Sequence, residues 1–528
     1  MSEPAPSEPA PSVELYDTTL RDGTQGEGLS LSCDDKLRIA ERLDAFGMRY
    51  IEAGWPGSNP KDAEFFERAA KGRWKNASIV AFGSTRRADV PAQRDESLAS
   101  LLRAETEVCT IFGKSWVLHV EEVLRTSLDE NLRMVEESVA LLQKQGRRVF
   151  FDAEHFFDGY RANADYALRV LAAAVAGGAD ALVLCDTNGG SDPWQVERIV
   201  GEVVQRFGVA IGIHPHDDGG CGVANAWAAV RAGASQVQGT INGYGERCGN
   251  VNLCTVAANL ELKAGLRCLP EGHLEQLSDL AHFVAEVANL PLRSQSPYVG
   301  RSAFAHKGGV HVAAMRRSAD SYQHIDPKRV GNDSRVLVSE LSGRGNILSK
   351  VEELGIPLDA GRAQEVLRQI KESEARGFSY EAAEASVALL ALRHSEGFSP
   401  RFRVVDYQAT VGKREGSPAF IEATVKVQVG EQTYHTAGEG NGPVSALDTA
   451  LRKALEPAFP QVREIQLADY KVRILSGSEG TSSMIRVLID FRDGHRNWST
   501  VGASTNIIEA SLLALVDGIE FELLRVSV

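Results

Sequence analysis

Eight short apolar runs separated by helical patterns constrain the fold of this chain more than any other feature. Successive runs begin 27 to 41 residues apart, at Val13, Arg49, Ser78, Glu107, Arg148, Asp180, Val209 and Gln236. Helix start signals lie between them, such as Ser32 before one apolar periodicity and Asn59-Pro60 before another. Strands that alternate with helices over roughly 250 residues are typical of a parallel barrel of eight βα units. The sequence therefore predicts an α/β fold with a (β/α)8 TIM barrel over residues 13–260.

Polar or charged residues follow nearly every apolar run. Asp152 and Glu154 end the fifth run, and Thr187 follows the sixth. In a βα barrel the C-terminal ends of the strands form the active-site face. Loop residues are polar in any protein, but carboxylates and histidines at so many strand ends favour a catalytic centre. A buried carboxylate after the fifth run would suit a general base.

The tripeptide His214-Pro215-His216 closes the seventh run and is a candidate metal clamp. Residues i and i+2 of a strand point to one face, so both imidazoles can reach one ion. Two hydrogen-bonded histidines at a strand end would explain the motif equally well. A carboxylate after the first run, Asp17 or Asp22, would complete a site with open positions for a chelating 2-oxo acid.

The rest of the chain predicts three further parts. Residues 1–12 form a Pro/Ala/Ser/Glu-rich disordered tail, residues 261–395 read as a helical linker subdomain, and residues 400–528 read as an α+β domain. The last domain contains an internal repeat, because segments starting at Gly438 and Gly502 both lead from a strand into an apolar helix. Such glycine-rich helix starts either bind an anion or simply turn tightly, so we expect regulation or dimerisation there.

Composition excludes several functions. A net charge of -14 argues against nucleic acid as a partner. No apolar stretch approaches the roughly 20 residues that a membrane span needs. The seven cysteines are scattered and form no CxxC pair, which fits a reducing compartment. We therefore expect a cytoplasmic protein without a nucleic-acid or membrane partner.

Three motifs resemble the acyl-CoA-condensing family of isopropylmalate, homocitrate and citramalate synthases. They are YDTTLRDGTQ from Tyr16, the HxH at 214–216, and GYGERCGN from Gly243. The resemblance runs from Val13 to Val528, and segments such as FDAEHFFDGY and SAFAHKGGVH are most similar to the long, citramalate-forming branch. It implies a divalent metal (Mg²⁺, Mn²⁺ or Zn²⁺), condensation of acetyl-CoA with pyruvate, and a place at the start of a pyruvate route to isoleucine.

The resemblance also implies a role for individual residues. Arg21, otherwise a candidate for a loop salt bridge, would polarise the oxo group. Glu154 would act in acid/base chemistry, and Thr187, with Asp152 beside it, would bind the oxo acid. The implied metal-site residues are Asp22, His214, His216 and Asn250. His311 and Tyr322 would reach the active site of a neighbouring subunit in a homodimer. An isoleucine effector would bind near Gly440, Asn441, Gly442, Ser504 and Asn506.

Two departures and three alternatives remain open at this level, and one departure is Ala313, where the family often carries an acid. The family reads HxHND, but Asp217 follows His216 here, which predicts an altered hydrogen-bonding environment around a metal that still binds. Isopropylmalate synthase chemistry on 2-oxoisovalerate is the nearest alternative, decided by a pocket near Phe82, Ile111 and Phe112. A 2-His-1-carboxylate iron oxygenase is a remote one, because such enzymes use double-sheet folds. The third is an inactive sensor, against which the intact polar set argues.

Overall fold

The computed structural model describes residues 12–525 apart from 316, 340, 341, 343, 354, 357, 414, 417, 476–479 and 495. Residues 1–11 of the predicted tail lie outside the described residues. Internal contacts divide the chain into one unit of Met1–Phe304 with Ile325–Asp333 and a second unit of Ala305–His324 with Ser334–Val528. This division falls within the segment expected to be a linker. Among the helices of the described residues, none is long and apolar enough to cross a membrane.

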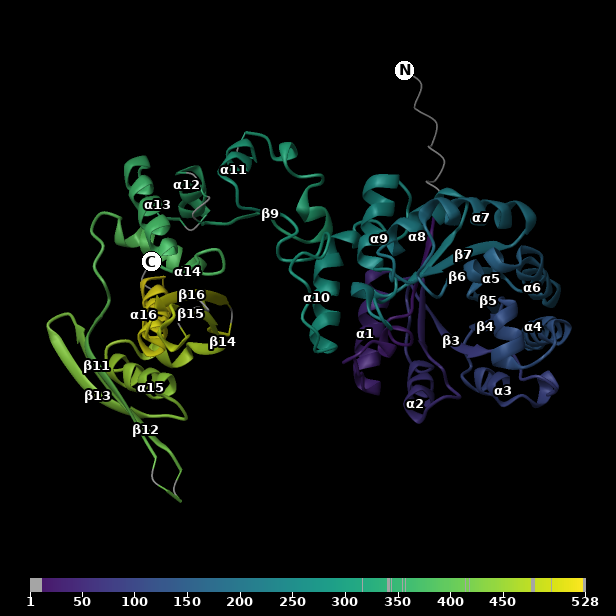
Figure 1. Cartoon of the computed structure of the whole chain (residues 1–528), viewed down its shortest axis with the longest axis horizontal. Coiled ribbons are helices and arrows are strands. Elements are labelled where there is room, and N and C mark those ends of the chain that lie inside the picture. The colour runs from purple at the N-terminus through teal and green to yellow at the C-terminus, as the bar shows by residue number, and fades with distance from the viewer. Residues whose placement is uncertain are drawn as a thin grey trace. The chain divides into compact units, whose positions relative to one another are not determined.

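The first unit is a closed barrel of eight parallel strands (Figure 1). The strands are β1 (Glu14–Asp17), β2 (Tyr50–Gly54), β3 (Ser78–Ser84), β4 (Val108–Lys114), β5 (Arg148–Glu154), β6 (Ala181–Asp186), β7 (Ala210–Pro215) and β8 (Gln236–Gly239). β1 pairs in parallel with both β2 and β8, which closes the ring. All eight predicted runs are strands, so the predicted barrel is confirmed.

The helices of this unit begin where the sequence signals a start. Ser32 and Asp35 form a capping box before α1, and Asn59 caps α2 with Pro60 in its first turn. The helices are α1 (Cys33–Phe46), α2 (Pro60–Ala69), α3 (Glu96–Arg103), α4 (Leu128–Lys144), α5 (Phe156–Ala162), α6 (Ala164–Gly177), α7 (Pro193–Arg206), α8 (Gly222–Arg231), α9 (Leu253–Asn259) and α10 (Leu277–Val287). Their apolar faces and the strands form one large buried core.

The second unit starts with short elements and three helices that share a core. The elements are β9 (Ala305–His306), α11 (Gly309–Met315), β10 (Arg335–Val336), α12 (Arg344–Glu353), α13 (Ala360–Ala375) and α14 (Glu384–Arg393). β9 and β10 pair in parallel. Buried aliphatic side chains such as Ile347, Val366 and Val387 join α12, α13 and α14.

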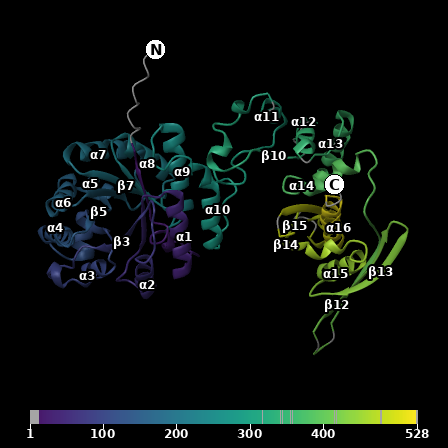
Figure 2. The ribbon, with the colours of Figure 1, turned by 180° about the vertical axis from the view of Figure 1, so that it is seen from behind.

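Two successive halves of equal build complete the second unit (Figure 2). The first is β11 (Arg403–Gly412), β12 (Phe420–Val429), β13 (Gln432–Glu439) and α15 (Pro443–Leu455). The second is β14 (Gln466–Ile474), β15 (Ile485–Arg492), β16 (Asn497–Ser504) and α16 (Ile507–Arg525). A register shift in the first strand of each antiparallel sheet falls between Val404 and Asp406 and between Leu467 and Asp469. The predicted internal repeat is confirmed.

Equivalent glycines let each helix pack closely on its sheet. A Cβ atom on Gly438 would lie 2.5 Å from the backbone nitrogen of Ala450, and one on Gly502 would lie 2.0 Å from the carbonyl oxygen of Ala510. Neither distance is tolerable, so both positions require glycine. The glycine-rich character of the two segments therefore has a packing cause in addition to any binding role.

Candidate active site

Two histidines and one carboxylate meet at the C-terminal mouth of the barrel. Asp22 follows β1, His214 lies at the end of β7, and His216 follows it. Asp22 Oδ2 lies 3.1 Å from His214 Nε2 and 3.8 Å from His216 Nε2. All three side chains are buried, and each offers a ligand atom within 4.8 Å of the others. The predicted strand geometry of the HxH motif is therefore present, and Asp22 is the carboxylate that faces it.

The surroundings of these groups fit a divalent cation. His214 Nδ1 lies 2.8 Å from Gln238 Oε1, which fixes the ring so that Nε2 faces Asp22 and is the nitrogen available to a cation. Asn250 forms a β-bridge with His216, and its buried Oδ1 has no hydrogen-bond partner among the described residues. A buried acceptor without a donor is costly, and a cation would satisfy it. The donor set of two imidazoles and oxygens admits Mg²⁺, Mn²⁺ or Zn²⁺.

Protonation in this cluster follows from burial and charge. Burial opposes ionisation of Asp22, but Arg21 and the two histidines outweigh it and hold the pKa of Asp22 well below its usual range. Burial would lower the pKa of His214, yet the hydrogen bond and charge of Asp22 raise it. Burial and the neighbouring His214 lower the pKa of His216 to about 4. The imidazole of His216 is therefore neutral near pH 7, which is the form that can bind a cation.

Arg21 is held rigidly beside the cluster. Its Nη1 lies 3.1 Å from Asp22 Oδ1, its Nε lies 2.6 Å from Glu52 Oε1, and its guanidinium carbon lies 3.8 Å from the centre of the Phe82 ring. Burial would lower the pKa of Arg21, but the charges of Asp22 and Glu52 raise it, so Arg21 stays protonated. Glu52 is completely buried and also accepts hydrogen bonds from Tyr16 and Thr18. Sequence reasoning gave Glu52 no role, although its place at the end of the second apolar run marked it.

Three aromatic side chains form a wall behind Arg21. Phe82 and Phe112 stack with ring centres 5.5 Å apart, and Trp55 meets both edge-on at 6.0 and 5.8 Å. The expected pocket residues Phe82 and Phe112 thus lie beside Arg21, whereas Ile111 is fully buried in the core. Trp55 was missed because nothing in its local sequence pattern distinguishes it.

The two carboxylates of β5 differ in environment. Glu154 forms an ion pair with Lys114, its register partner on β4. Asp152 is buried and accepts a hydrogen bond from Gln238 Nε2 at 3.2 Å. Burial and the charge of Glu52 raise the pKa of Asp152 to about 7. The buried carboxylate expected in this strand is therefore Asp152.

Seven of the predicted residues lie in the second unit. His311 on α11 and Tyr322 stack with ring centres 4.2 Å apart. Their reach into a neighbouring subunit stays a prediction. Gly440, Asn441 and Gly442 precede α15, which has no side-chain cap. Ser504 and Asn506 precede α16, and Asn506 Oδ1 accepts the N–H of Ile508. The effector site also stays a prediction.

Asp217 contacts a helix start and not the histidines. Its Oδ1 accepts the N–H of Gly222, the first residue of α8, at 2.7 Å. This is a favourable place for a carboxylate, and an asparagine oxygen would accept the same bond. Within the part of the chain that the structure describes, its side chain forms no hydrogen bond or ion pair with Asp22, His214 or His216. The expectation that Asp217 changes the environment of the metal is thus not supported by its contacts.

We expect Asp217→Asn to change metal affinity by less than about threefold, whereas loss of a hydrogen-bond partner of a metal ligand costs about 10- to 100-fold. Isothermal titration of the metal-free protein with Mn²⁺ measures this, with Gln238→Leu as the matched variant that removes the contact to His214 Nδ1. A tenfold change in Asp217→Asn would return this residue to the metal environment.

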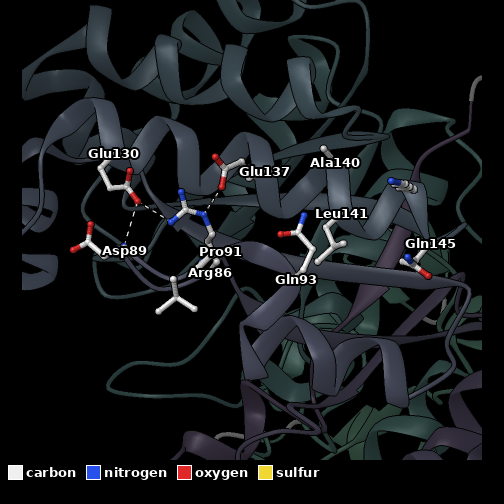
Figure 3. A pocket seen from close by; sticks show the side chains of 11 residues that line it. Arg86, Asp89, Pro91, Gln93, Glu130, Glu137, Ala140, Leu141 and Gln145 are labelled. Atoms are coloured by element: carbon white, nitrogen blue, oxygen red, sulfur yellow. Dashed lines mark hydrogen bonds and ion pairs between the residues drawn. The ribbon is translucent and has the colours of Figure 1, made fainter.

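A cavity of about 690 Å³ lies apart from this cluster, over α4 and the segment after β3 (Figure 3). Arg86 is its buried cation, and both Glu130 and Glu137 point toward it and pair with it at 2.7 Å. The backbone nitrogen of Arg86 also donates to Ser138 Oγ. Because the charges of Arg86 are satisfied internally, this cavity carries no evidence of a ligand.

The barrel and its mouth define a class of protein. A closed parallel barrel that presents a carboxylate, an HxH pair and a fixed arginine is an HMGL-like barrel enzyme, and the family profile described as HMGL-like matches residues 12–284. Profiles described as "Homocitrate synthase post-HMGL domain-like" and "LeuA allosteric (dimerisation) domain" match residues 298–377 and 381–523. The double-sheet fold of the iron-oxygenase alternative is absent from the described residues of this unit.

The chain belongs to the (R)-citramalate synthase family. It is 52% identical over 517 residues to the (R)-citramalate synthase of Aquifex aeolicus, covering 97% of this chain and 98% of that one. It is also 52% identical over 518 residues to the (R)-citramalate synthase of Geobacter sulfurreducens, covering 97% of each. A 2-isopropylmalate synthase of Yersinia pestis is 29% identical over 513 residues, covering 96% of this chain and 94% of that one.

Proposed function

We propose that this chain is an acyltransferase that condenses acetyl-CoA with pyruvate and releases citramalate and CoA. The observation that carries the proposal is the buried cluster of Asp22, His214 and His216 with Arg21 fixed against it. That arrangement suits a substrate that offers a ketone and a carboxylate to one site. The sequence identity of 52% to two (R)-citramalate synthases, over nearly the full length of the chain, supports the same substrates.

The chain's own groups divide the work. Asp22, His214, His216 and Asn250 would hold a divalent cation, which supplies Lewis-acid polarisation of the ketone when bound. Arg21 donates to the ketone oxygen and stabilises the negative charge that grows there. Thr187 binds the carboxylate of pyruvate, with Asp152 nearby.

The reaction also needs a base for the acetyl methyl group and a water molecule for the thioester. A base, His311 or Glu154, removes a proton from the acetyl methyl group, and the resulting carbon attacks the ketone. Tyr322, stacked on His311, would assist it. Water then cleaves the thioester to a carboxylate and the free thiol of CoA, which makes the condensation effectively irreversible.

A second cavity suits the acyl donor. It has a volume of about 780 Å³, and Asn250 and the cation Arg293 are among its lining residues. Its size is in the range of cofactor sites, and the cation matches a phosphate of CoA. We place acetyl-CoA here, with its thioester directed to the metal cluster.

The aromatic wall favours pyruvate over the branched substrate of the alternative reaction. Phe82 packs flat on Arg21 and is itself buried, which limits the room beside the ketone. We expect Phe82→Leu to raise kcat/KM for 2-oxoisovalerate relative to pyruvate by about tenfold, because one or two methylenes in such a pocket are worth that much. Phe66→Leu on α2 is the control. An unchanged ratio would remove Phe82 from the specificity pocket.

The decisive experiment measures release of free thiol from acetyl-CoA with pyruvate, 2-oxobutyrate or 2-oxoisovalerate, with and without EDTA. We expect the highest kcat/KM with pyruvate and loss of activity in EDTA that added Mg²⁺, Mn²⁺ or Zn²⁺ restores. No release with any acid would refute the synthase function. Preference for 2-oxoisovalerate would assign isopropylmalate synthase activity instead.

The second unit is proposed to regulate the enzyme. Its match to a LeuA allosteric (dimerisation) domain supports a homodimer. We assign isoleucine as the effector, bound near the two glycine-rich helix starts, and we place the reaction at the beginning of a cytoplasmic route to that amino acid. Inhibition by isoleucine but not by leucine in the thiol assay is the matching observation.

A further inference from the structure

Two neighbouring loops hydrogen-bond to Thr187, one to its side chain and one to its backbone. Its Oγ1 accepts the backbone N–H of His155 at 2.9 Å, and its carbonyl oxygen accepts Arg247 Nη2 at 2.7 Å. His155 follows β5 and Arg247 follows β8. The loops after these two strands therefore both hydrogen-bond to Thr187, which follows β6. Among the described residues no acceptor takes the hydroxyl proton of Thr187. The hydroxyl group of Thr187 accepts one hydrogen bond and can still donate its proton to an oxygen atom of a bound ligand.

His155 reaches Thr187 through an uncommon backbone conformation. Its φ is 55° and its ψ is 35°, in the left-handed region that glycine adopts freely and that few other residues adopt, Asn, Asp and His more often than the rest. The side chain is anchored at the same time. Its Nδ1 lies 3.4 Å from Asp158 Oδ2, and its ring meets that of His119 edge-on at 4.3 Å. Such strain persists only where the surroundings enforce it.

Asp158 extends this anchor to the residue next to Thr187. Its Oδ2 also accepts Asn188 Nδ2 at 3.0 Å, so one carboxylate ties the loop after β5 to the loop after β6. The loops that carry His155 and Thr187 are thereby joined, while the left-handed backbone of His155 sets the direction of its N–H.

Arg247 holds the backbone carbonyl of Thr187 and is itself held by an ion pair. It has a φ of 56° and makes a two-pronged ion pair with Asp218, at 2.8 and 2.9 Å. Gly189, with a φ of 60°, admits Asp218 to this place, because a Cβ atom there would lie 2.6 Å from Asp218 Oδ2. The ion pair therefore locks the loops after β6, β7 and β8 together.

We propose that His155 and Arg247 are positioning residues that fix Thr187 so that its hydroxyl donates to the carboxylate of the 2-oxo acid. The inference rests on the proposed function, since it assumes that a 2-oxo acid is the substrate. Left-handed backbone at position 155 is the element that aims the N–H, and the Arg247–Asp218 pair is the element that holds the carbonyl. Neither side chain needs to touch the substrate.

The test compares variants that differ in tolerance of the left-handed conformation. His155→Gly keeps the conformation and the N–H, whereas His155→Val disfavours it strongly. We expect His155→Val to raise KM for pyruvate roughly tenfold to a hundredfold, the value of a hydrogen bond to a charged group, with KM for acetyl-CoA unchanged. His155→Gly and His155→Asn should stay near the native KM. Arg247→Lys, which loses the two-pronged pair, should raise the same KM.

A double-mutant cycle separates positioning from general damage. In a Thr187→Val background, which lacks the hydroxyl, His155→Val should add less than about twofold to KM for pyruvate, because both changes remove one interaction. Equal KM values for the glycine and valine variants, additive effects in the cycle, or a fall in kcat alone would overturn the proposal. Failure of the native enzyme to release thiol with any 2-oxo acid would instead refute the proposed function. Thermal unfolding verifies that each variant is folded.

Discussion

Asp22→Asn is expected to lower kcat/KM for pyruvate by roughly a thousandfold or more, because it removes the carboxylate that faces the two histidines. The carboxylate also balances the charge of Arg21 at 3.1 Å. An amide of the same shape offers a weaker oxygen ligand and no negative charge. Metal affinity, measured by titration with Mn²⁺, should fall together with activity.

The matched control for Asp22→Asn is Asp34→Asn on α1, whose side chain is 75% exposed. It makes the same chemical change at an exposed side chain that pairs with Arg68, and we expect native activity. If Asp22→Asn kept native metal affinity while losing activity, Asp22 would act on Arg21 and not as a ligand. If both properties stayed native, the cluster would not be the metal site.

Arg21→Lys is expected to lower kcat roughly a hundredfold to a thousandfold while metal affinity changes little. The guanidinium contacts Asp22, Glu52 and the Phe82 ring at once, through separate groups of a flat side chain. A lysine ammonium is a single point charge and cannot keep all three contacts. The charge would therefore be retained but misplaced relative to the ketone oxygen.

The control for Arg21→Lys is Arg87→Lys, a change at a side chain that is 72% exposed. Rate constants for pyruvate at saturating acetyl-CoA, together with Mn²⁺ titration, give the required comparison. A loss of less than about fivefold in kcat would mean that charge alone suffices and that the orientation set by Glu52 is dispensable. A parallel loss of metal affinity would place the effect on Asp22.

The sequence predicts the barrel and the shared face of His214 and His216 well because both depend on local pattern. Strand and helix periods identify all eight βα units, and the spacing of His214 and His216 places both rings on one face. The side-chain partners were not predictable in the same way. Glu52 meets Arg21, and Lys114 meets Glu154, only because adjacent strands pair in a particular register. Single-sequence patterns contain no information on that register.

Asp217 shows that the position of a residue in a motif can suggest a contact that its side chain does not make. Its position in a motif suggested a role at the metal, whereas its side chain turns away to the first turn of α8. Adjacent residues on an irregular segment point in different directions, and no period fixes which way. The left-handed conformation of His155 was equally inaccessible to prediction, because only a few per cent of non-glycine residues adopt it and the contacts that surround this one come from distant parts of the chain.

The contrast between the closed barrel and the two open sheets also bears on solubility. The eight strands of the barrel leave no free edge, whereas each three-stranded sheet of the second unit ends in unpaired strands. β11, one of those edge strands, exposes Val405, Tyr407 and Val411. Exposed edges with apolar side chains are the usual starting points of aggregation. A change that destabilises the sheet of β11 would thus show first as precipitation of a purified sample, before any loss of catalytic activity in the barrel.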